Sequence, residues 1–230
     1  PMPPMSGIPP PPAPAFSGAT CEDGDILVSG YDHLLLGYNS FGTLIINQDI
    51  SSTYRPEKLI VEGEHLMVEQ VQSGTTNHFM AHYNRASLAI QNLLFLPIDV
   101  VSICPFDDES LLIFGNDNGQ ARVFQYSYLE NVIWEPRTLA LGSVIDAVKS
   151  NGNTYFIAQS AGIYAYTFAP NYLNFIVQGV ISSGLVFDTD RGVLLSSSGN
   201  MIQEYSTEGA LIAAHQFSDD VVSFDIHYTK

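Results

Sequence analysis

The chain is poor in charge, and most of the charge it has is of one sign. Only 14% of its 230 residues are charged, and 8 basic residues stand against 24 acidic ones, for a formal net charge of −16. The basic residues form no cluster along the sequence. Partners rich in phosphate are bound by concentrated Lys and Arg. The composition therefore excludes nucleic acid and anionic membrane surfaces as primary partners.

Long apolar runs and a cysteine framework are also missing. No apolar stretch reaches the roughly 18 residues of a membrane helix, so we expect no membrane insertion. Cys21 and Cys104 are too few for a disulfide scaffold. The chain begins Pro1-Met2-Pro3, with neither a charged n-region nor an apolar h-region. Because an initiator Met before Pro is readily removed, this start predicts a protein that is not secreted by a signal peptide.

Proline is concentrated at one end of the sequence. Eight prolines fall within the first fourteen positions, which favours an extended polyproline II segment that cannot bury its own backbone. The change of composition predicts a proline-rich arm over residues 1–20 and one folded domain over residues 21–230. We expect the arm to dock on a neighbouring protein subunit through Pro3, Pro4, Ile8, Pro9, Pro10, Pro11, Pro12, Pro14 and Phe16.

Helical periodicity is absent from residues 21–230, and a strand repeat takes its place. Apolar residues alternate or come in short runs between Gly, Asn, Asp and Ser, as is typical of strands. An apolar segment that ends in tyrosine and a small polar residue occurs five times, at Tyr38, Tyr83, Tyr126, Tyr166 and Tyr205. These tyrosines are 39 to 45 residues apart. That period is typical of a four-stranded propeller blade.

The other strands of each repeat surround the tyrosine strand. A preceding strand is expected at Ile26–Gly30, Leu66–Gln70, Leu111–Gly115, Tyr155–Gln159 and Val193–Ser197, and an outer strand at Thr43–Asn47, Leu88–Phe95, Val132–Leu139, Leu173–Gln178 and Leu211–Phe217. Inner strands are expected at Lys58–Val61, Val100–Ile103, Val144–Val148 and Leu185–Asp188. The fifth inner strand is expected at the C-terminus, because Asp220–Asp225 is similar to Asp99–Cys104. Pairing of Val221–Ile226 with Ile26–Gly30 would protect both sheet edges.

This organisation resembles five-bladed β-propellers over residues 21–230. The resemblance implies an all-β fold, a five-bladed β-propeller closed by the C-terminal strand, with an extended proline-rich N-terminal arm. Lectins of the tachylectin type and propeller domains of phage tails are similar in blade length and compactness. No motif of either family matches residue by residue, so the resemblance implies no site residue.

Candidates for catalysis and metal binding are few. Asp146, Asp188 and Asp225 lie on inner strands, where paired carboxylates could serve a compact glycosidase. The repeats leave no room for cleft-building loops, so we interpret these residues as turn caps or channel lining. The segment 116–119 lacks the later Glu of a calcium loop and is interpreted as a hairpin turn. His78 and His82 are too far apart along a strand to hold one ion. We expect no catalytic residue, metal site or cofactor.

The five repeated tyrosines allow two interpretations. They could stack on five sugars of a glycan, or they could pack between blades. The pattern favours packing, and both interpretations stay open at this point.

We therefore predict a non-enzymatic assembly protein, specifically a virion component such as a tail, fibre or capsid-attached subunit. The propeller would be a rigid interaction module, and the arm would hold it to its neighbours. The first alternative is a carbohydrate-binding propeller, a lectin or adhesin located outside the cell or on its surface. The second is a compact glycosidase that would depend on Asp188 or Asp225.

Overall fold

The protein is all-β in every part that the structure describes. The computed structural model describes residues 15–20, 26–30, 34–39, 41, 43–49, 53–134, 136–179, 184–221 and 224. Twenty-one strands and no helix occur in these ranges, so none of the described residues form a helix able to cross a membrane. The described residues fall into two compact units, one ending at Phe95 and the other starting at Leu96.

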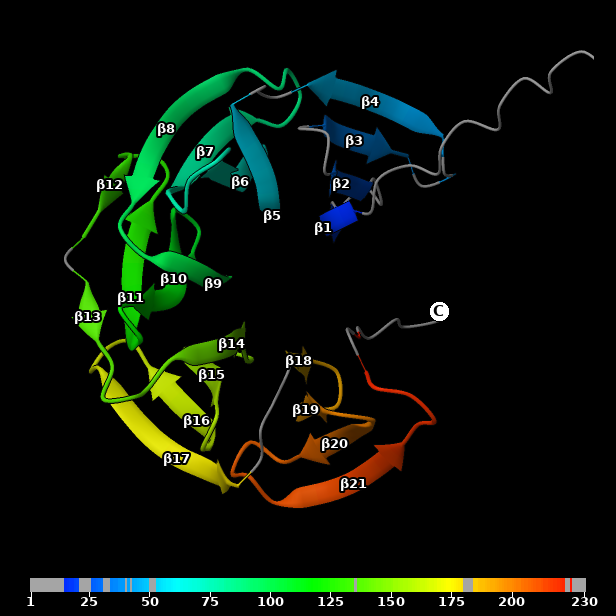
Figure 1. Ribbon diagram of the computed structural model, residues 1–230, viewed down its shortest axis with the longest axis vertical. Coiled ribbons are helices and arrows are strands. Elements are labelled where there is room, and N and C mark those ends of the chain that lie inside the picture. The colour runs from blue at the N-terminus through cyan, green and yellow to red at the C-terminus, as the bar shows by residue number, and fades with distance from the viewer. Residues whose placement is uncertain are drawn as a thin grey trace, which may run out of the picture. The chain divides into compact units, whose positions relative to one another are not determined.

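The first unit contains two antiparallel sheets of four strands (Figure 1). The first sheet has the order β1 (Ala15–Thr20), β2 (Ile26–Gly30), β3 (Leu34–Tyr38) and β4 (Leu44–Asp49). The second has the order β5 (Tyr54–Glu62), β6 (His65–Gln72), β7 (His78–Asn84) and β8 (Ile90–Leu96). The two sheets share a core in which Leu35 of β3 packs with Leu59, Leu66, Val68, Ala81 and Tyr83 of the second sheet.

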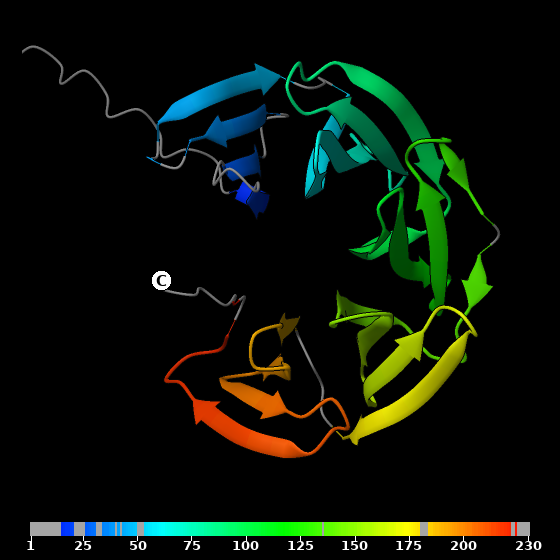
Figure 2. The ribbon, with the colours of Figure 1, turned by 180° about the vertical axis from the view of Figure 1, so that it is seen from behind.

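The second unit contains three sheets. The third sheet has β9 (Asp99–Asp107), β10 (Ser110–Asp117), β11 (Gln120–Ser127) and an outer strand in two pieces, β12 (Val132–Ile133) and β13 (Arg137–Thr138). The fourth has β14 (Val144–Lys149), β15 (Thr154–Gln159), β16 (Gly162–Thr167) and β17 (Tyr172–Gln178). The fifth has β18 (Gly184–Asp188), β19 (Val193–Ser198), β20 (Met201–Tyr205) and β21 (Leu211–Gln216). In Figure 1 and from behind in Figure 2, β17 and β21 lie on the opposite side of their sheets from β14 and β18.

Aromatic side chains fill the space between the sheets of the second unit. Phe114 of the third sheet packs against Tyr155 and Tyr166 of the fourth, with ring centroids 5.7 and 6.2 Å apart. Phe156 of the fourth sheet stacks on Phe187 of the fifth, with centroids 5.7 Å apart. Since large aromatic rings bury the most apolar surface per residue, these contacts hold neighbouring sheets together face to face.

Tight turns join the strands where the sequence provides residues that accept a positive φ. The two-residue loop between β10 and β11 consists of Asn118 and Gly119, with φ of 51° and 79°. Both central residues of a type I′ hairpin turn need this conformation, which Asn and Gly adopt at low cost. The interpretation of segment 116–119 as a hairpin turn is therefore confirmed.

Most predicted strands are confirmed, and one outer strand is interrupted. Apart from the inner strand expected at the C-terminus, the inner, second, tyrosine-bearing and outer strands expected from the repeat all overlap strands of the structure. The outer strand expected over Val132–Leu139 is split, with Trp134 and Pro136 between its two pieces. Proline has no N–H to donate to a ladder, so it is found at edges and breaks of sheets.

The predicted pairing of the C-terminal strand with Ile26–Gly30 is wrong. Strand β2 pairs with β1 on one edge and with β3 on the other, so neither edge remains for Val221–Ile226. The Val221 N–H donates instead to the Gly199 carbonyl oxygen at 2.8 Å, beside the fifth sheet. Strand β1 comes from residues assigned to the arm, and Ala15–Thr20 pairs with β2 at the edge of the first sheet.

Candidate functional site

In four of the five sheets, the inner strand has a bulge at one position of the repeat. The pairing register shifts between Ala15 and Ser17 in β1, Pro56 and Lys58 in β5, Val100 and Ser102 in β9, and Val144 and Asp146 in β14. A bulge bends its strand and redirects the side chain that follows it. In the second unit the residues immediately after the bulge are Ser102 and Asp146, so the bulge sets the direction of their side chains.

Asp146 links the inner strands of all three sheets of the second unit. Its Oδ1 accepts hydrogen bonds from Ser102 Oγ of β9 at 2.6 Å and from the Ala147 N–H at 2.8 Å. Its Oδ2 accepts a hydrogen bond from the Leu185 N–H of β18 at 2.8 Å. The Ala147 N–H also donates to Ser102 Oγ at 3.2 Å. Both carboxylate oxygens thus accept hydrogen bonds from within the fold, and Asp146 connects β14 to β9 and β18.

Asp188 caps a turn. Its side chain is buried, and its Oδ1 accepts the Arg191 N–H at 2.8 Å. The Arg191 guanidinium lies 3.7 Å from Asp188 Oδ2 and also bonds Glu204, which lowers the pKa of Glu204. The interpretation of Asp188 as a turn cap is confirmed, whereas Asp225 lies outside the described residues.

Four of the five repeated tyrosines are buried. Tyr126 and Tyr166 have 0% of their surface exposed, and Tyr83 and Tyr205 have 3%. A buried ring offers no face to a sugar, so the burial of these four favours the packing interpretation. Tyr38 is partly exposed, and its ligand-binding role stays a prediction.

Two of these tyrosines hold the turn that follows them. Tyr126 and Tyr166 donate through their hydroxyls to Oδ1 of Asn131 at 3.3 Å and of Asn171 at 2.9 Å. Both asparagines have positive φ, 53° and 38°. The spacing of five residues from Tyr to Asn is visible in the sequence and could have identified this capping role.

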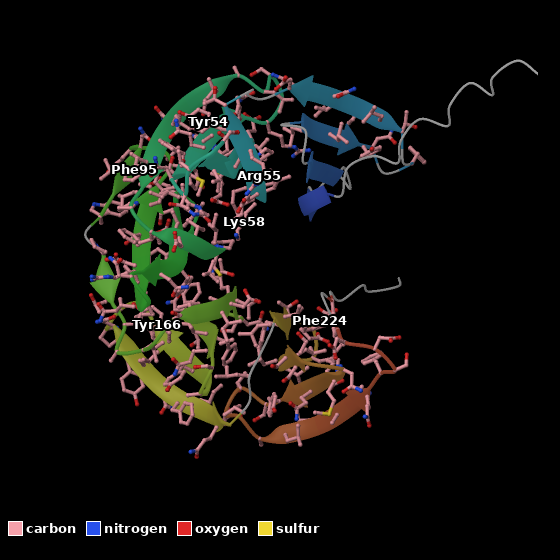
Figure 3. All side chains as sticks on the ribbon, viewed as in Figure 1. Tyr54, Arg55, Lys58, Phe95, Tyr166 and Phe224 are labelled. Carbon is pink, nitrogen blue, oxygen red and sulfur yellow. The ribbon has the colours of Figure 1, made fainter. Side chains whose placement is uncertain are left out.

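The histidines of the first unit have separate partners. His78 Nδ1 lies 2.6 Å from Glu69 Oε1, while His82 Nε2 lies 2.8 Å from His65 Nδ1. Lys58 Nζ lies 3.9 Å from Glu69 Oε2, and Figure 3 shows Lys58 and Arg55 extending from β5. In the described part of the chain, no three His, Cys, Asp or Glu residues gather in a way that could hold a metal.

Two cavities meet at the break in the outer strand of the third sheet. One has a volume of about 330 Å³ and is lined by Asp107, Asp108, Glu109, Ser110, Gln125, Ser127, Glu130 and Trp134. The other, of about 570 Å³, is lined by Gln125, Trp134, Pro136, Arg137 and Phe168. Arg137 Cζ lies 3.6 Å above the centre of the Phe168 ring. Trp134 lines both cavities, and no sequence pattern pointed to a role for it.

Comparison with known proteins identifies the fold. No family model and no curated protein sequence matches the chain. Among solved structures it is similar to a streptogramin B lyase (TM-score 0.70, 12% identity, 92% of this chain and 71% of that one). It is also similar to virginiamycin B lyase from Staphylococcus aureus (TM-score 0.68, 12% identity, 89% and 70%) and to the Dos1 propeller (TM-score 0.64, 9% identity, 90% and 61%). The chain has a β-propeller fold.

The likeness extends to the fold and no further. The chain spans only 61% to 71% of the length of these three propellers. At such low identity, a shared propeller fold carries many unrelated functions. The function of this chain must therefore be inferred from its own residues.

The predicted arm contacts fall mostly outside the described residues. Phe16 lies in β1 of the first propeller sheet. The proline positions from Pro3 to Pro14, with Ile8, precede the first described residue. Their role in binding a neighbouring subunit stays a prediction.

The buried acids of the propeller core predict a loss of stability at high pH. Burial raises the pKa of Tyr126 and of the Cys104 thiol to about 12, and it raises the pKa of Tyr155 and Tyr166 as well. Unfolded tyrosine and cysteine ionise at about pH 10 and 8.5. The folded state thus holds these protons more tightly than the unfolded state, and its stability is complete below those values. We expect the free energy of unfolding to fall progressively from about pH 9 to pH 12.

Urea unfolding at a series of pH values measures this loss, with phenolate absorbance as a second signal. The absorbance of the buried tyrosines should appear together with unfolding. Above pH 10, Tyr126→Phe should reduce the slope of the unfolding free energy against pH by the equivalent of up to one proton released on unfolding. Complete phenolate absorbance near pH 10 in a protein that stays folded would contradict the prediction.

Proposed function

We propose that this propeller is a non-enzymatic binding module that holds another protein on its outer strands. The observation that carries the proposal is that the outer strand of every sheet, or the residue next to it, exposes large apolar side chains. They are Leu44 and Ile45 by β4, Ile90, Leu93 and Phe95 in β8, Val132 and Trp134 by β12, Tyr172 and Phe175 in β17, and Leu211, Ile212 and Phe217 by β21. Phe95 is labelled in Figure 3.

Apolar side chains in these positions favour a partner. Single exposed apolar residues are ordinary, but several on one strand are typical of interaction surfaces. Phe95 is held in place by Phe79, whose ring centroid lies 5.5 Å away, so its exposed part is presented in a fixed position. Low charge further reduces the cost of removing water from such a surface.

The inner strands support the non-enzymatic part of the proposal. The carboxylates considered for catalysis, Asp146 and Asp188, are bound to backbone N–H groups of the same fold. A general acid or base must instead reach a substrate atom. The finer prediction, a virion subunit tethered by its proline-rich arm, rests on the sequence.

Partner binding by the tagged whole chain tests the proposal. Leu93→Ser with Phe95→Ser, and Leu211→Ser with Ile212→Ser, remove apolar surface from one outer strand in each unit. Matched controls are Gln91→Ser and Gln216→Ser, which change exposed polar residues of the same strands. A protein captured from the native source is purified and titrated against each variant. Because burying one large apolar side chain contributes about 1.5–3 kcal/mol, we expect at least a tenfold weaker affinity for one apolar pair and unchanged affinity for the controls.

Two outcomes contradict the proposal. One is a purified partner that binds both apolar pairs as tightly as the original chain. The other is a chain that retains no protein partner at all. Circular dichroism of each variant shows whether the fold is kept.

A further inference from the structure

The smaller cavity of the third sheet combines one aromatic side chain with several acidic ones. Trp134, the single tryptophan of the chain, is 42% exposed and lines it. Asp107 lines it from the end of β9, Asp108 and Glu109 from the turn before β10, and Glu130 from the turn after β11. No Lys or Arg is among its lining residues.

The floor of this cavity is built by hydrogen bonds. Ser110, only 2% exposed, donates through Oγ to Asp107 Oδ1 at 2.6 Å and accepts Gln125 Nε2 at 3.2 Å. The Glu109 N–H donates to Asp107 Oδ1 at 3.0 Å, and Tyr128 donates its hydroxyl to the Asp108 carbonyl oxygen. The acidic turn is therefore fixed before any ligand arrives, and a preformed site loses less entropy on binding.

A cation suits this combination better than a neutral or anionic group. The face of a tryptophan ring attracts a cation more strongly than other aromatic rings do. Carboxylates form charge-assisted hydrogen bonds with guanidinium and ammonium groups. The adjoining cavity contains the same kind of contact within the chain, since Arg137 lies over the Phe168 ring and donates to the Phe168 carbonyl oxygen. Both cavities share Trp134 and Gln125.

We propose that the Trp134 cavity binds an arginine or lysine side chain of the protein partner. Its volume of about 330 Å³ is at the lower end for ligand sites, about 300–1,000 Å³, which fits one long side chain rather than a folded segment. The net charge of −16 also attracts a basic segment over a distance. A neutral saccharide could stack on the tryptophan ring and donate hydroxyl hydrogen bonds to the carboxylates, but it would bring no positive charge to offset the four negative ones.

The inference rests on the proposed function only in naming a protein as the source of the side chain. Binding to the cavity is therefore measured with peptides, without the partner. Fluorescence polarisation follows a labelled Gly-Arg-Gly-Arg-Gly peptide titrated with the whole chain, and a Gly-Gln-Gly-Gln-Gly peptide is the neutral probe. Glu109→Gln combined with Glu130→Gln removes two charges at the cavity. Trp134→Ala removes the ring, and Glu64→Gln, an exposed carboxylate of the first unit, is the matched control.

We expect the arginine peptide to bind and the glutamine peptide not to bind. The double Gln variant should weaken binding about threefold to tenfold and Trp134→Ala about fivefold or more, with no change for Glu64→Gln. Binding to the original chain should alter Trp134 fluorescence and should weaken from about 20 to 500 mM salt. Melting curves confirm that each variant is folded.

Equal binding of the two peptides, no binding of either, or unchanged affinity in the double Gln variant would overturn the inference. So would maltose altering Trp134 fluorescence where the arginine peptide does not, since the site would then be a saccharide site. These results are independent of the outer-strand variants. If the arginine peptide does not bind but the outer-strand variants weaken partner binding, only the cavity site is rejected. If the peptide binds but the outer-strand variants leave partner binding unchanged, only the proposed function is rejected.

Discussion

Gly162→Ala is expected to destabilise the second unit by about 3 kcal/mol or more. Gly162 begins β16 with φ of +147°, a conformation that residues with a side chain rarely adopt. A Cβ at this position would lie 1.9 Å from the Val177 carbonyl oxygen and 2.8 Å from Phe175 Cε2. Both atoms belong to β17, which pairs with β16. The two strands must separate to admit one methyl group, so backbone strain and lost packing add together.

Two other glycines separate these contributions. Gly152 has φ of +100°, but nothing lies within 4 Å of a Cβ built there. Gly152→Ala should therefore cost only the conformational term, about 1 kcal/mol. At Gly142 the nearest atom is Gln159 Oε1 at 3.6 Å, an ordinary contact, so Gly142→Ala should change stability by less than about 0.5 kcal/mol. Urea unfolding measures all three, and equal losses at Gly162 and Gly152 would contradict the steric argument.

The repeat period predicted most of the sheets because it is a local property. Each sheet consists of consecutive strands joined by short turns, so the alternation of apolar residues and turn residues such as Asn118 and Gly119 was sufficient. The inner strand of the first sheet was assigned wrongly because a distant segment was preferred to a local one. Similarity between Asp220–Asp225 and Asp99–Cys104 suggested a distant pairing, whereas β1 reaches β2 through a short connection at a smaller entropic cost.

The candidate site could be predicted only in part. The sequence identified Asp146 as an inner-strand residue, but the bond to Leu185 N–H joins residues 39 positions apart and has no local signal. The cavity at Trp134 arises where the outer strand breaks, and it combines two turns with a strand end. Sequence patterns identify strands and turns, but they do not show which turns lie next to each other in space.

Asp146→Ala is expected to lower the free energy of unfolding by about 3 kcal/mol. Hydrogen bonds to a charged group contribute about 1.5–3 kcal/mol each, and these losses are not additive. The substitution removes the acceptors for Ser102 Oγ, Ala147 N–H and Leu185 N–H. The Leu185 N–H loses the acceptor that joins β18 to β14, because Asp146 reaches it from the neighbouring sheet. Asp190→Ala, at an exposed turn of the fifth sheet, is the matched control and should be nearly neutral.

A double-mutant cycle measures how much the hydrogen bond between Ser102 and Asp146 contributes to stability. Ser102→Ala alone should cost about 1 kcal/mol, and the Ser102–Asp146 pair should show a coupling energy of at least about 0.5 kcal/mol. Additive losses would mean that the 2.6 Å hydrogen bond between them contributes little. The cycle also separates fold from chemistry: partner binding measured on folded Asp146→Asn should stay unchanged, because the proposed binding surfaces are the outer strands and the Trp134 cavity. A folded Asp146→Asn variant that loses binding would instead assign this carboxylate to the functional site.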